Sequence, residues 1–225
     1  MTRSIALAAA ITLALALGGG LWWQSGRTAA LPETPILGAA SAQEAAEVDT
    51  STVAEMALGA EDAPVTVIEY ASFTCPHCAD FHADQFKKLK ADYVDTGKVR
   101  FVFRETYSDR YGLWASMIAR CGSEDRFFGM TDLIFKGQED WVRAGGPTEI
   151  VGELRKIGRL AGLEEDQLEA CLSDADKAQT LVAWYQQNAT ADEIEATPSL
   201  VINGQKYSNM AYDELSALID EKLGE

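Results

Sequence analysis

Two cysteines, Cys75 and Cys78, stand two residues apart in a Cys-Pro-His-Cys motif that follows an apolar run of strand character. Cysteines at this spacing can form and break a disulfide reversibly, which suits the pair to thiol–disulfide exchange. Pro76 favours the first turn of a helix, so Cys75 would lie at the positive end of that helix, where unpaired N–H groups stabilise a thiolate. His77 could add a positive charge or a hydrogen-bond donor nearby. The motif therefore predicts Cys75 as the attacking sulfur and Cys78 as the resolving one.

Three other uses of the cysteine pair agree less well with the sequence. A structural zinc site could take both cysteines and His82, but a fourth ligand is missing because Cys121 and Cys171 are each isolated in sequence. A haem attachment site needs histidine directly after the second cysteine, where this chain has Ala79. A purely structural disulfide would close a short loop and restrict the unfolded chain little. Redox chemistry is therefore favoured, and a metal-binding module is the alternative from a different functional class.

The N-terminus has the features of an export signal. Arg3 precedes an apolar run over residues 5–17, and Trp22 and Trp23 follow where interfacial aromatic residues would anchor a membrane span. The run with its extension is about 20 residues long, which is nearly enough to cross a bilayer. A cleaved signal peptide and a retained signal-anchor over residues 1–28 both remain open. Either one exports the rest of the chain to a compartment where disulfides persist.

The composition limits what the rest of the chain can be. Its formal net charge is −16, and acidic chains repel nucleic acid phosphates, so we expect no nucleic-acid partner. Residues 29–55 are rich in Ala, Pro, Thr, Glu and Gly and have little apolar periodicity, which predicts a flexible linker. Residues 56–225 are long enough for one well-buried domain.

A strand–helix–strand unit is predicted around the cysteine pair. Alternating apolar residues indicate strands over residues 65–71 and 98–104, joined by a helix from Pro76 to about Thr96. Such a unit pairs its strands in parallel through a right-handed crossover. His82 belongs to an apolar stripe of the helix, so we expect it to pack in the core and not to bind a metal.

The remaining elements follow from the same patterns. Helical periods run from about residue 111 to 188 and predict a helical subdomain inserted into the fold. Strand character returns over residues 199–202, and the Asn203-Gly204 dipeptide behind it is a strong hairpin signal. An amphipathic helix over residues 211–223 closes the chain.

Two segments of the chain resemble the DsbA family of periplasmic thiol:disulfide oxidoreductases. The sequence EYASFTCPHCADFH, residues 69–82, looks like that family's active-site motif, and ATPSLVING, residues 196–204, looks like its cis-proline segment. The resemblance covers residues 56–223. It implies an α/β thioredoxin fold with a helical insertion over about residues 108–190.

The resemblance also implies a mechanism and a set of site residues. A substrate thiolate attacks the oxidised pair at Cys75, and a second substrate cysteine then displaces Cys75. The Thr197–Pro198 bond is expected to be cis and to lie beside the pair, where Thr197 can bond to an extended substrate; a trans loop is the alternative. Glu69, in the apolar strand before the motif, is a candidate proton relay to Cys78. Its alternatives are an exposed edge position or an ion pair.

Two cysteines remain, Cys121 and Cys171, and both lie in the helical insertion. In an exported chain such a pair usually bonds, so we expect a structural disulfide, with two free thiols as the alternative. Closing a loop of about 50 residues would contribute ~4 kcal/mol in the chain-entropy treatment. Some alphaproteobacterial-type members of the family are similar in carrying a second bridge.

One residue departs from the family pattern and bears on the direction of the reaction. The best-known oxidants of the family have valine where this chain has Thr197, and threonine there resembles the isomerase and reductase branches. Dimeric isomerases carry a dimerisation domain ahead of the catalytic one, and residues 29–61 are too short and aperiodic to supply it. We therefore expect a monomeric oxidase, with an isomerase or reductase as the alternative.

The partners expected from the resemblance are proteins. The expected substrates are reduced exported proteins. A second expected partner is a membrane redox protein that reoxidises the dithiol. No cofactor and no metal are expected. The expected location is the periplasm, with the protein either soluble after signal cleavage or tethered to the inner membrane.

Overall fold

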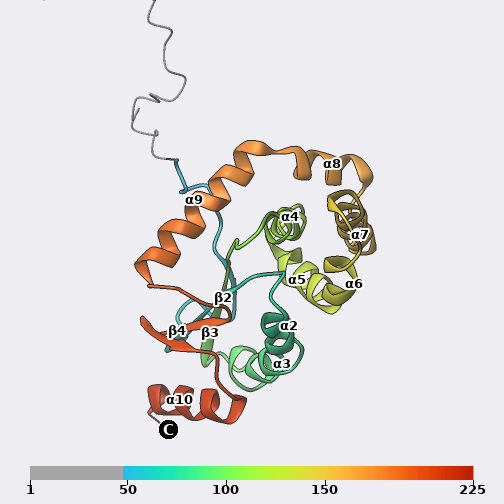
Figure 1. Ribbon diagram of the computed structural model, residues 1–225. Helices are drawn as coiled ribbons and strands as arrows, with labels where there is room; N and C mark the ends of the chain where they lie inside the picture. The colour runs from blue at the N-terminus through green and yellow to red at the C-terminus, as the bar shows by residue number, and fades with distance from the viewer. Residues whose placement is uncertain (1–47, 225) are drawn as a thin grey trace, which may run out of the picture. The chain divides into compact units, whose positions relative to one another are not determined.

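The computed structural model describes residues 48–224, which form one sheet with helices against both of its faces (Figure 1). The sheet has five strands in the order β1-β3-β2-β4-β5. Their bounds are β1 Met56–Leu58, β2 Val65–Ala71, β3 Val99–Glu105, β4 Ser199–Ile202 and β5 Gln205–Ser208. The predicted signal or anchor over residues 1–28 lies outside the described residues.

Two inner strands, β2 and β3, run parallel, and the other neighbouring strands pair antiparallel. The chain passes from β2 to β3 through helices, so the predicted strand–helix–strand unit is confirmed. Asn203 and Gly204 join β4 to β5 with φ of 47° and 80°, the positive values that a tight hairpin turn requires. The hairpin prediction is therefore confirmed. Strand β1 was not predicted, because three residues are too few for an alternating pattern.

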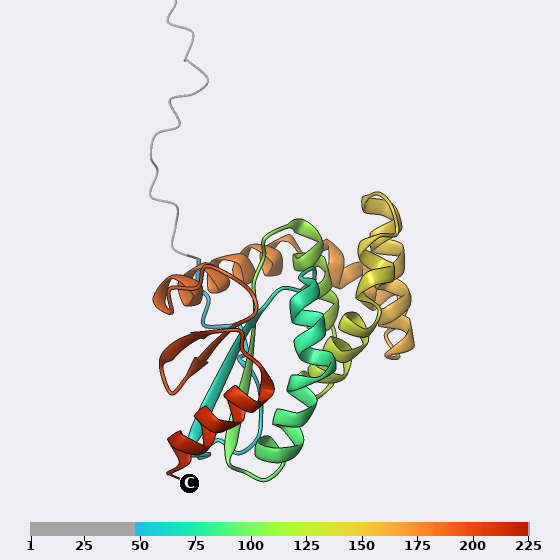
Figure 2. The ribbon, with the colours of Figure 1, turned by 60° about the horizontal axis from the view of Figure 1, so that its bottom comes forward.

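Helices fill the two connections of the sheet. Between β2 and β3 lie α2 Pro76–Ala83, α3 Gln85–Leu89 and the π-helical η1 Lys90–Val94. Between β3 and β4 lies the helical insertion, which comprises α4 Arg110–Ala119, the short η2 Glu124–Arg126, α5 Phe127–Lys136, α6 Gln138–Val142, α7 Pro147–Leu160, α8 Glu165–Ser173 and α9 Ala175–Ala191 (Figure 2). The last helix is α10 Tyr212–Leu223. Within residues 48–224, no helix combines the length and apolar character needed to cross a membrane.

The continuous helix predicted from Pro76 to about Thr96 is wrong in one respect. The backbone of Asp84 leaves helical geometry (φ −120°, ψ −69°), which separates α2 from α3, and η1 then continues with π-helical bonds. Neither proline nor glycine marks this break in the sequence. The predicted apolar stripe is nevertheless buried along its whole length, at His82, Phe86, Leu89 and Tyr93.

The sheet separates two apolar clusters. The larger cluster lies under α2, α3 and α10 and includes Val67 and Ala71 of β2 with Cys78 and Phe81 of α2. The smaller cluster lies on the opposite face, where Tyr70 of β2 packs against α9. Because successive strand residues point to opposite faces, β2 contributes to both clusters. Helix α2, which includes Cys78, therefore packs on the larger cluster.

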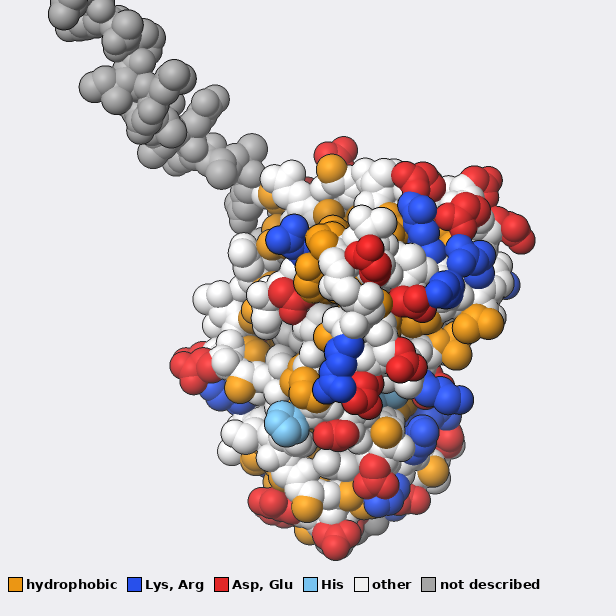
Figure 3. Space-filling view, turned by 45° about the vertical axis from the view of Figure 1, so that its right-hand side comes forward, with side chains coloured by type: hydrophobic (Ala, Val, Ile, Leu, Met, Phe, Trp, Pro, Cys, Tyr) orange, Lys and Arg blue, Asp and Glu red, His pale blue; other side chains and the backbone are white. Residues whose placement is uncertain are grey.

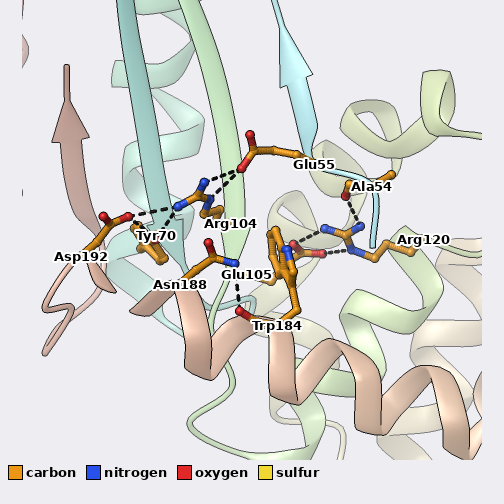
Figure 4. Close-up of polar contacts among 9 residues, drawn as sticks. All are labelled: Ala54, Glu55, Tyr70, Arg104, Glu105, Arg120, Trp184, Asn188 and Asp192. Carbon is orange, nitrogen blue, oxygen red and sulfur yellow. Dashed lines mark hydrogen bonds and ion pairs between the residues drawn. The ribbon is translucent and has the colours of Figure 1, made fainter. Parts of the chain in front are cut away.

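Residues 48–55, the end of the predicted linker, contact the domain. Glu55 pairs with Arg104 of β3 at 2.6 Å, and Arg104 also donates to the Tyr70 hydroxyl and to Asp192 after α9 (Figure 4). Composition alone predicts a flexible linker here, and this end of it instead forms specific polar contacts. Residues 29–47 of the predicted linker lie outside the described residues. The contacts of residues 48–55 were not predicted, because an ion pair leaves no trace in apolar periodicity.

A second arginine forms a buried ion pair. Arg120, at the end of α4, donates from Nε and Nη2 to the two carboxylate oxygens of Glu105 at 2.6 and 2.7 Å, and from Nη1 to the Ala54 carbonyl at 2.9 Å (Figure 4). The guanidinium carbon lies 5.5 Å from the ring centre of Trp184 in α9. The pair thus connects β3, the helical insertion and the segment before β1.

The face shown in Figure 3 carries acidic and basic side chains interspersed with small apolar groups. No continuous basic area of the kind that binds nucleic acid phosphates is present on this face.

Candidate active site

The turn after β2 delivers Cys75 to the start of α2. Cys75 is the N-terminal cap of that helix, with an extended backbone (φ −82°, ψ 118°), and Pro76 occupies the first turn. The Cys75 carbonyl accepts hydrogen bonds from the N–H groups of Cys78 and Ala79 at 3.1 and 3.2 Å. Cys75 is half-buried and Cys78 is buried, and both are free thiols. One sulfur is therefore accessible and the other is enclosed.

The surroundings of Cys75 favour its thiolate. A hydrogen bond from the Cys78 thiol has the largest effect, and the Thr197 side chain and the N–H groups of Cys78 and His77 add to it against the effect of burial. Together they lower the pKa of Cys75 to about 5. The His77 ring is exposed and lies 3.9 Å from Asp80. Of the two contributions suggested for His77, a positive charge or a hydrogen-bond donor, the backbone N–H supplies the donor.

Cys78 and Glu69 are held in their protonated forms. The hydrogen bond to Cys75 and burial have the largest effects and raise the pKa of Cys78 far above its ordinary value; the Cys75 thiolate adds to this, and an ionised Glu69 would do the same. Burial, with a smaller effect of Cys75, also raises the pKa of Glu69 well above its ordinary value. The two sulfurs of the pair thus differ strongly in acidity.

Glu69 lies in β2 with its side chain on the face of the larger apolar cluster. Val67 and Ala71, two residues before and two residues after Glu69, belong to that cluster and share its face of the strand. Glu69 is 0% exposed. Neither carboxyl oxygen has a hydrogen-bond partner in the part of the chain that the structure describes. An exposed edge position and an ion pair, the two alternatives for Glu69, both disagree with this environment. Burial of an unpaired carboxyl is tolerable only when it is neutral, which agrees with the raised pKa.

The segment before β4 lies beside the cysteine pair. The Thr197–Pro198 peptide bond is cis, and the Cys75 sulfur lies 3.5 Å from the Thr197 carbonyl oxygen. β4 pairs with β2, and β2 leads directly to Cys75. This pairing brings together the two motifs that the sequence singled out, although 122 residues separate Cys75 from Thr197.

His82, the third residue of the hypothetical zinc site, packs in the core. Its ring stacks on Phe86 with ring centres 4.5 Å apart, and its Nε2 lies 3.8 Å from Asp132. Burial lowers the pKa of His82 to about 4. Among residues 48–224, no group of three or more His, Cys, Asp or Glu side chains is placed to hold a metal ion.

Two contacts of the cysteine loop were not predicted from the sequence. Gln138, the first residue of α6, donates from Nε2 to the carbonyls of Phe73 and Cys75 at 2.8 and 2.9 Å. Asp109, the cap of α4, accepts a hydrogen bond from the Thr74 hydroxyl at 2.6 Å. An aspartate before a helix is a recognisable cap. A glutamine after a glycine carries no signal of its role.

A cavity of about 580 Å³ opens beside the cysteine loop. Thr74 and Pro76 line one side, and Phe135, Gln138 and Val142 of the helical insertion line the other. The cavity is therefore bounded by the insertion as well as by α2 and the turn before it.

The other two cysteines, Cys121 and Cys171, are joined by a disulfide with Cα atoms 5.7 Å apart. Cys121 follows α4 and Cys171 belongs to α8. The bridge therefore fastens two helices of the insertion to each other.

Comparison with known proteins gives consistent matches. A profile of the family described as Thioredoxin matches residues 51–221. A putative protein-disulfide oxidoreductase of Rickettsia bellii is 37% identical over 172 residues, which cover 76% of this chain and 65% of that protein. Disulfide bond formation protein D of Bacillus subtilis is 30% identical over 181 residues, which cover 74% of this chain and 76% of that protein. The crystal structure of Wolbachia pipientis alpha-DsbA1 matches with a TM-score of 0.69 and 28% identity, covering 76% of this chain and 91% of that one.

The parallel β2–β3 unit, the cysteine pair at the start of α2 and the profile match define a thioredoxin-fold protein, so the predicted α/β thioredoxin fold is confirmed. With these relatives, the chain belongs to the DsbA family of thiol:disulfide oxidoreductases.

Proposed function

We propose that this protein introduces disulfide bonds into exported proteins by thiol–disulfide exchange through Cys75 and Cys78. The observation that carries the proposal is the placement of the pair, with Cys75 half-buried at the start of α2 and Cys78 buried behind it; the pKa values of the two thiols shift in opposite directions accordingly. A stable Cys75 thiolate favours the reduced dithiol form of the protein, and a protein whose reduced form is stabilised is a strong oxidant. The names of the Rickettsia and Bacillus relatives support the same activity.

The reaction transfers two electrons from the client to the protein. A client thiolate attacks the Cys75 sulfur of the oxidised pair, so a client–Cys75 disulfide forms and the Cys75–Cys78 bond breaks. Cys78 leaves as a thiolate and takes up a proton, in agreement with its raised pKa. A second client thiolate then attacks the client sulfur of the mixed disulfide, and Cys75 leaves as a thiolate. The client gains a disulfide, and the protein ends as the dithiol.

Glu69 is proposed as the group that relays the proton to and from Cys78. Both side chains are 0% exposed, and ionisation of Glu69 would raise the pKa of Cys78 further, so the protonation states of the two groups are coupled. A neutral carboxyl can give a proton to the departing Cys78 thiolate and can take it back when the pair is reoxidised.

Thr197 is proposed to align the client. Its carbonyl lies 3.5 Å from the Cys75 sulfur, so a polypeptide bonded to Cys75 passes next to the Thr197 backbone. Backbone hydrogen bonds to an extended client segment are independent of the client's side chains. This suits a protein that acts on many clients.

Oxidised protein mixed with a reduced, unfolded disulfide-containing client tests the proposal. We expect the client to regain its disulfides and its activity. Cys75→Ser should abolish this oxidation, and so should Cys78→Ser, because neither variant can form the oxidised pair. When Cys78→Ser is mixed instead with a client that still has its disulfides, its Cys75 thiolate should attack one of them, release the other client sulfur as a thiolate and accumulate a client–Cys75 mixed disulfide that is visible under non-reducing conditions. Oxidation by Cys75→Ser at the unaltered rate would contradict the proposal.

Disulfide isomerisation is the second candidate function, and Thr197 is the observation that favours it, because threonine at this position resembles the isomerase and reductase branches. The same assay with a scrambled client separates the two functions. Faster recovery of the scrambled client than of the reduced client would favour isomerisation.

The location and the redox partner are part of the proposal. A membrane protein that accepts the two electrons from the dithiol would return the pair to its oxidised form. The proposed site of action is the periplasm. Two measurements in cells test these points. The Cys75–Cys78 pair should be found oxidised, and it should become reduced when the oxidation of exported thiols is blocked.

A further inference from the structure

The loop that carries Cys75 is held by the helical insertion on two sides. The first contact is made by Gln138 of α6, which is 7% exposed. Its single Nε2 atom donates to the carbonyls of Phe73 and Cys75 at 2.8 and 2.9 Å. These carbonyls belong to residues on either side of Thr74, so one amide group fixes the path of the backbone through the loop.

The second contact is made by Asp109, at the start of α4. Its Oδ1 accepts from the N–H groups of Tyr111 and Gly112 at 2.8 and 2.9 Å, which fixes the carboxylate at the helix start. Its Oδ2 accepts from the Thr74 hydroxyl at 2.6 Å. Thr74 also contacts the Ser72 hydroxyl at 3.0 Å. The loop side chain is therefore bound to a carboxylate that the insertion holds rigidly.

These contacts act on the position of the attacking sulfur. The Cys75 sulfur is stabilised by the N–H groups of His77 and Cys78, and this requires the sulfur to stay over the start of α2. The Cys75 carbonyl already accepts from Cys78 and Ala79, and Gln138 adds a third donor. Removing a contact gives the loop freedom to move the sulfur away from these donors.

We propose that Gln138 together with the Thr74–Asp109 pair forms a clasp by which the helical insertion positions Cys75 for thiol–disulfide exchange. The proposal rests on the function proposed above for Cys75. Gln138 and Asp109 are positioning residues, because they act through the loop and not on the client. The insertion thus takes part in setting the oxidising strength of the pair.

The test measures the thiolate titration of Cys75 and the equilibrium of the pair with glutathione in three variants. Gln138→Met keeps the side-chain length without a donor, and Thr74→Val keeps the shape without the hydroxyl. Each is expected to raise the Cys75 pKa by at least ~0.5 units and to shift the equilibrium about threefold toward the oxidised protein. The double variant should reach about tenfold, which corresponds to ~30 mV.

Gln138→Glu distinguishes positioning from packing. A carboxyl of the same size has at most one hydrogen to donate, whereas the amide of Gln138 donates to two carbonyls, so at least one contact is lost while the side-chain volume is kept, and the Cys75 pKa should rise. Because Thr74 is only half-buried, Thr74→Val measures one arm of the clasp even where a change at Gln138 disturbs folding. Gln186→Met, at an exposed position of α9, is the matched control and should leave both readouts unchanged.

The outcomes separate the clasp from the function on which it rests. If the unaltered protein shows a low Cys75 pKa that Gln138→Met and Thr74→Val do not change, the clasp is overturned and the proposed function stands. If the unaltered protein titrates like an ordinary thiol, both are overturned. Raised pKa values in both variants and an unchanged control support the clasp.

Discussion

Individual residues explain why two cysteines so close in sequence behave differently. Cys75 caps a helix and receives hydrogen bonds, whereas Cys78 is enclosed among apolar side chains and keeps its proton in a hydrogen bond to Cys75. The sequence predicts the helix start from Pro76, and with it the stabilised thiolate. It leaves open whether His77 adds a positive charge or a hydrogen-bond donor, and the backbone N–H of His77 is the donor in the structure.

Replacing Glu69 by Gln tests the buried carboxyl. Its folded pKa is raised, so its contribution to stability is present below the unfolded pKa near 4.5 and is lost as the pH rises. Relative to the unaltered protein, Glu69→Gln should therefore gain about 1–3 kcal/mol in the free energy of unfolding between pH 4 and pH 7. Urea unfolding at the two pH values measures this change. An equal difference at both would contradict a buried neutral carboxyl.

The same variant should slow the chemistry that involves Cys78. We expect the rate at which Cys78 resolves a preformed mixed disulfide to fall by about tenfold or more, since a positioned acid–base group contributes on the order of 10²-fold. Rapid-mixing measurements on the mixed disulfides of the unaltered protein and of Glu69→Gln give this rate. An unchanged rate would remove Glu69 from the mechanism while leaving Cys75 and Cys78 in it.

Helices and strands bring the site together, and some of them were predictable from particular residues. The alternation in β2, the Asn203-Gly204 turn and the apolar stripe of α2 and α3 follow from local periodicity and turn chemistry. The break at Asp84 and the contact from Gln138 were not predictable. Both depend on tertiary packing between segments far apart in sequence, which periodicity does not report.

The buried pair of Arg120 and Glu105 is expected to stabilise the junction of β3 and α4. Arg120→Met should lower the free energy of unfolding by about 3–5 kcal/mol, because it leaves the Glu105 carboxylate buried without a partner. Adding Glu105→Gln should recover part of the loss. The exposed pair of Arg143 and Glu139 is the control, and Arg143→Met should change stability by less than about 0.5 kcal/mol. Equal losses for both arginines would contradict this explanation.

The disulfide between Cys121 and Cys171 should stabilise the insertion by restricting the unfolded chain. The cysteines are 50 residues apart, so replacing both with Ala should lower the free energy of unfolding by ~4 kcal/mol. Denaturant unfolding of the variant with Cys75 and Cys78 in the same redox state measures the loss. A loss below about 1 kcal/mol would show that the bridge constrains little.

For the domain as a whole, the redox state of the cysteine pair should set how stability varies with pH. The Cys75 pKa is lowered to about 5 in the folded reduced protein, from an ordinary value of 9.0. Its contribution is therefore present above pH 9 and is lost as the pH falls through about 5. The oxidised protein has no such thiol to titrate. The reduced protein should gain stability relative to the oxidised one between pH 5 and pH 9, as measured by unfolding both forms. A constant difference would contradict the low Cys75 pKa.

Titration of the reduced protein, followed by thiolate absorbance, tests the low Cys75 pKa in a single experiment. Because the pKa of Cys78 is raised far above its ordinary value, only Cys75 should ionise below pH 9. We expect one transition with a midpoint near pH 5 that is absent from Cys75→Ser. A single midpoint near 9, the ordinary value for cysteine, would mean that the helix start does not hold the Cys75 thiolate, and the proposed oxidase would lose its physical basis.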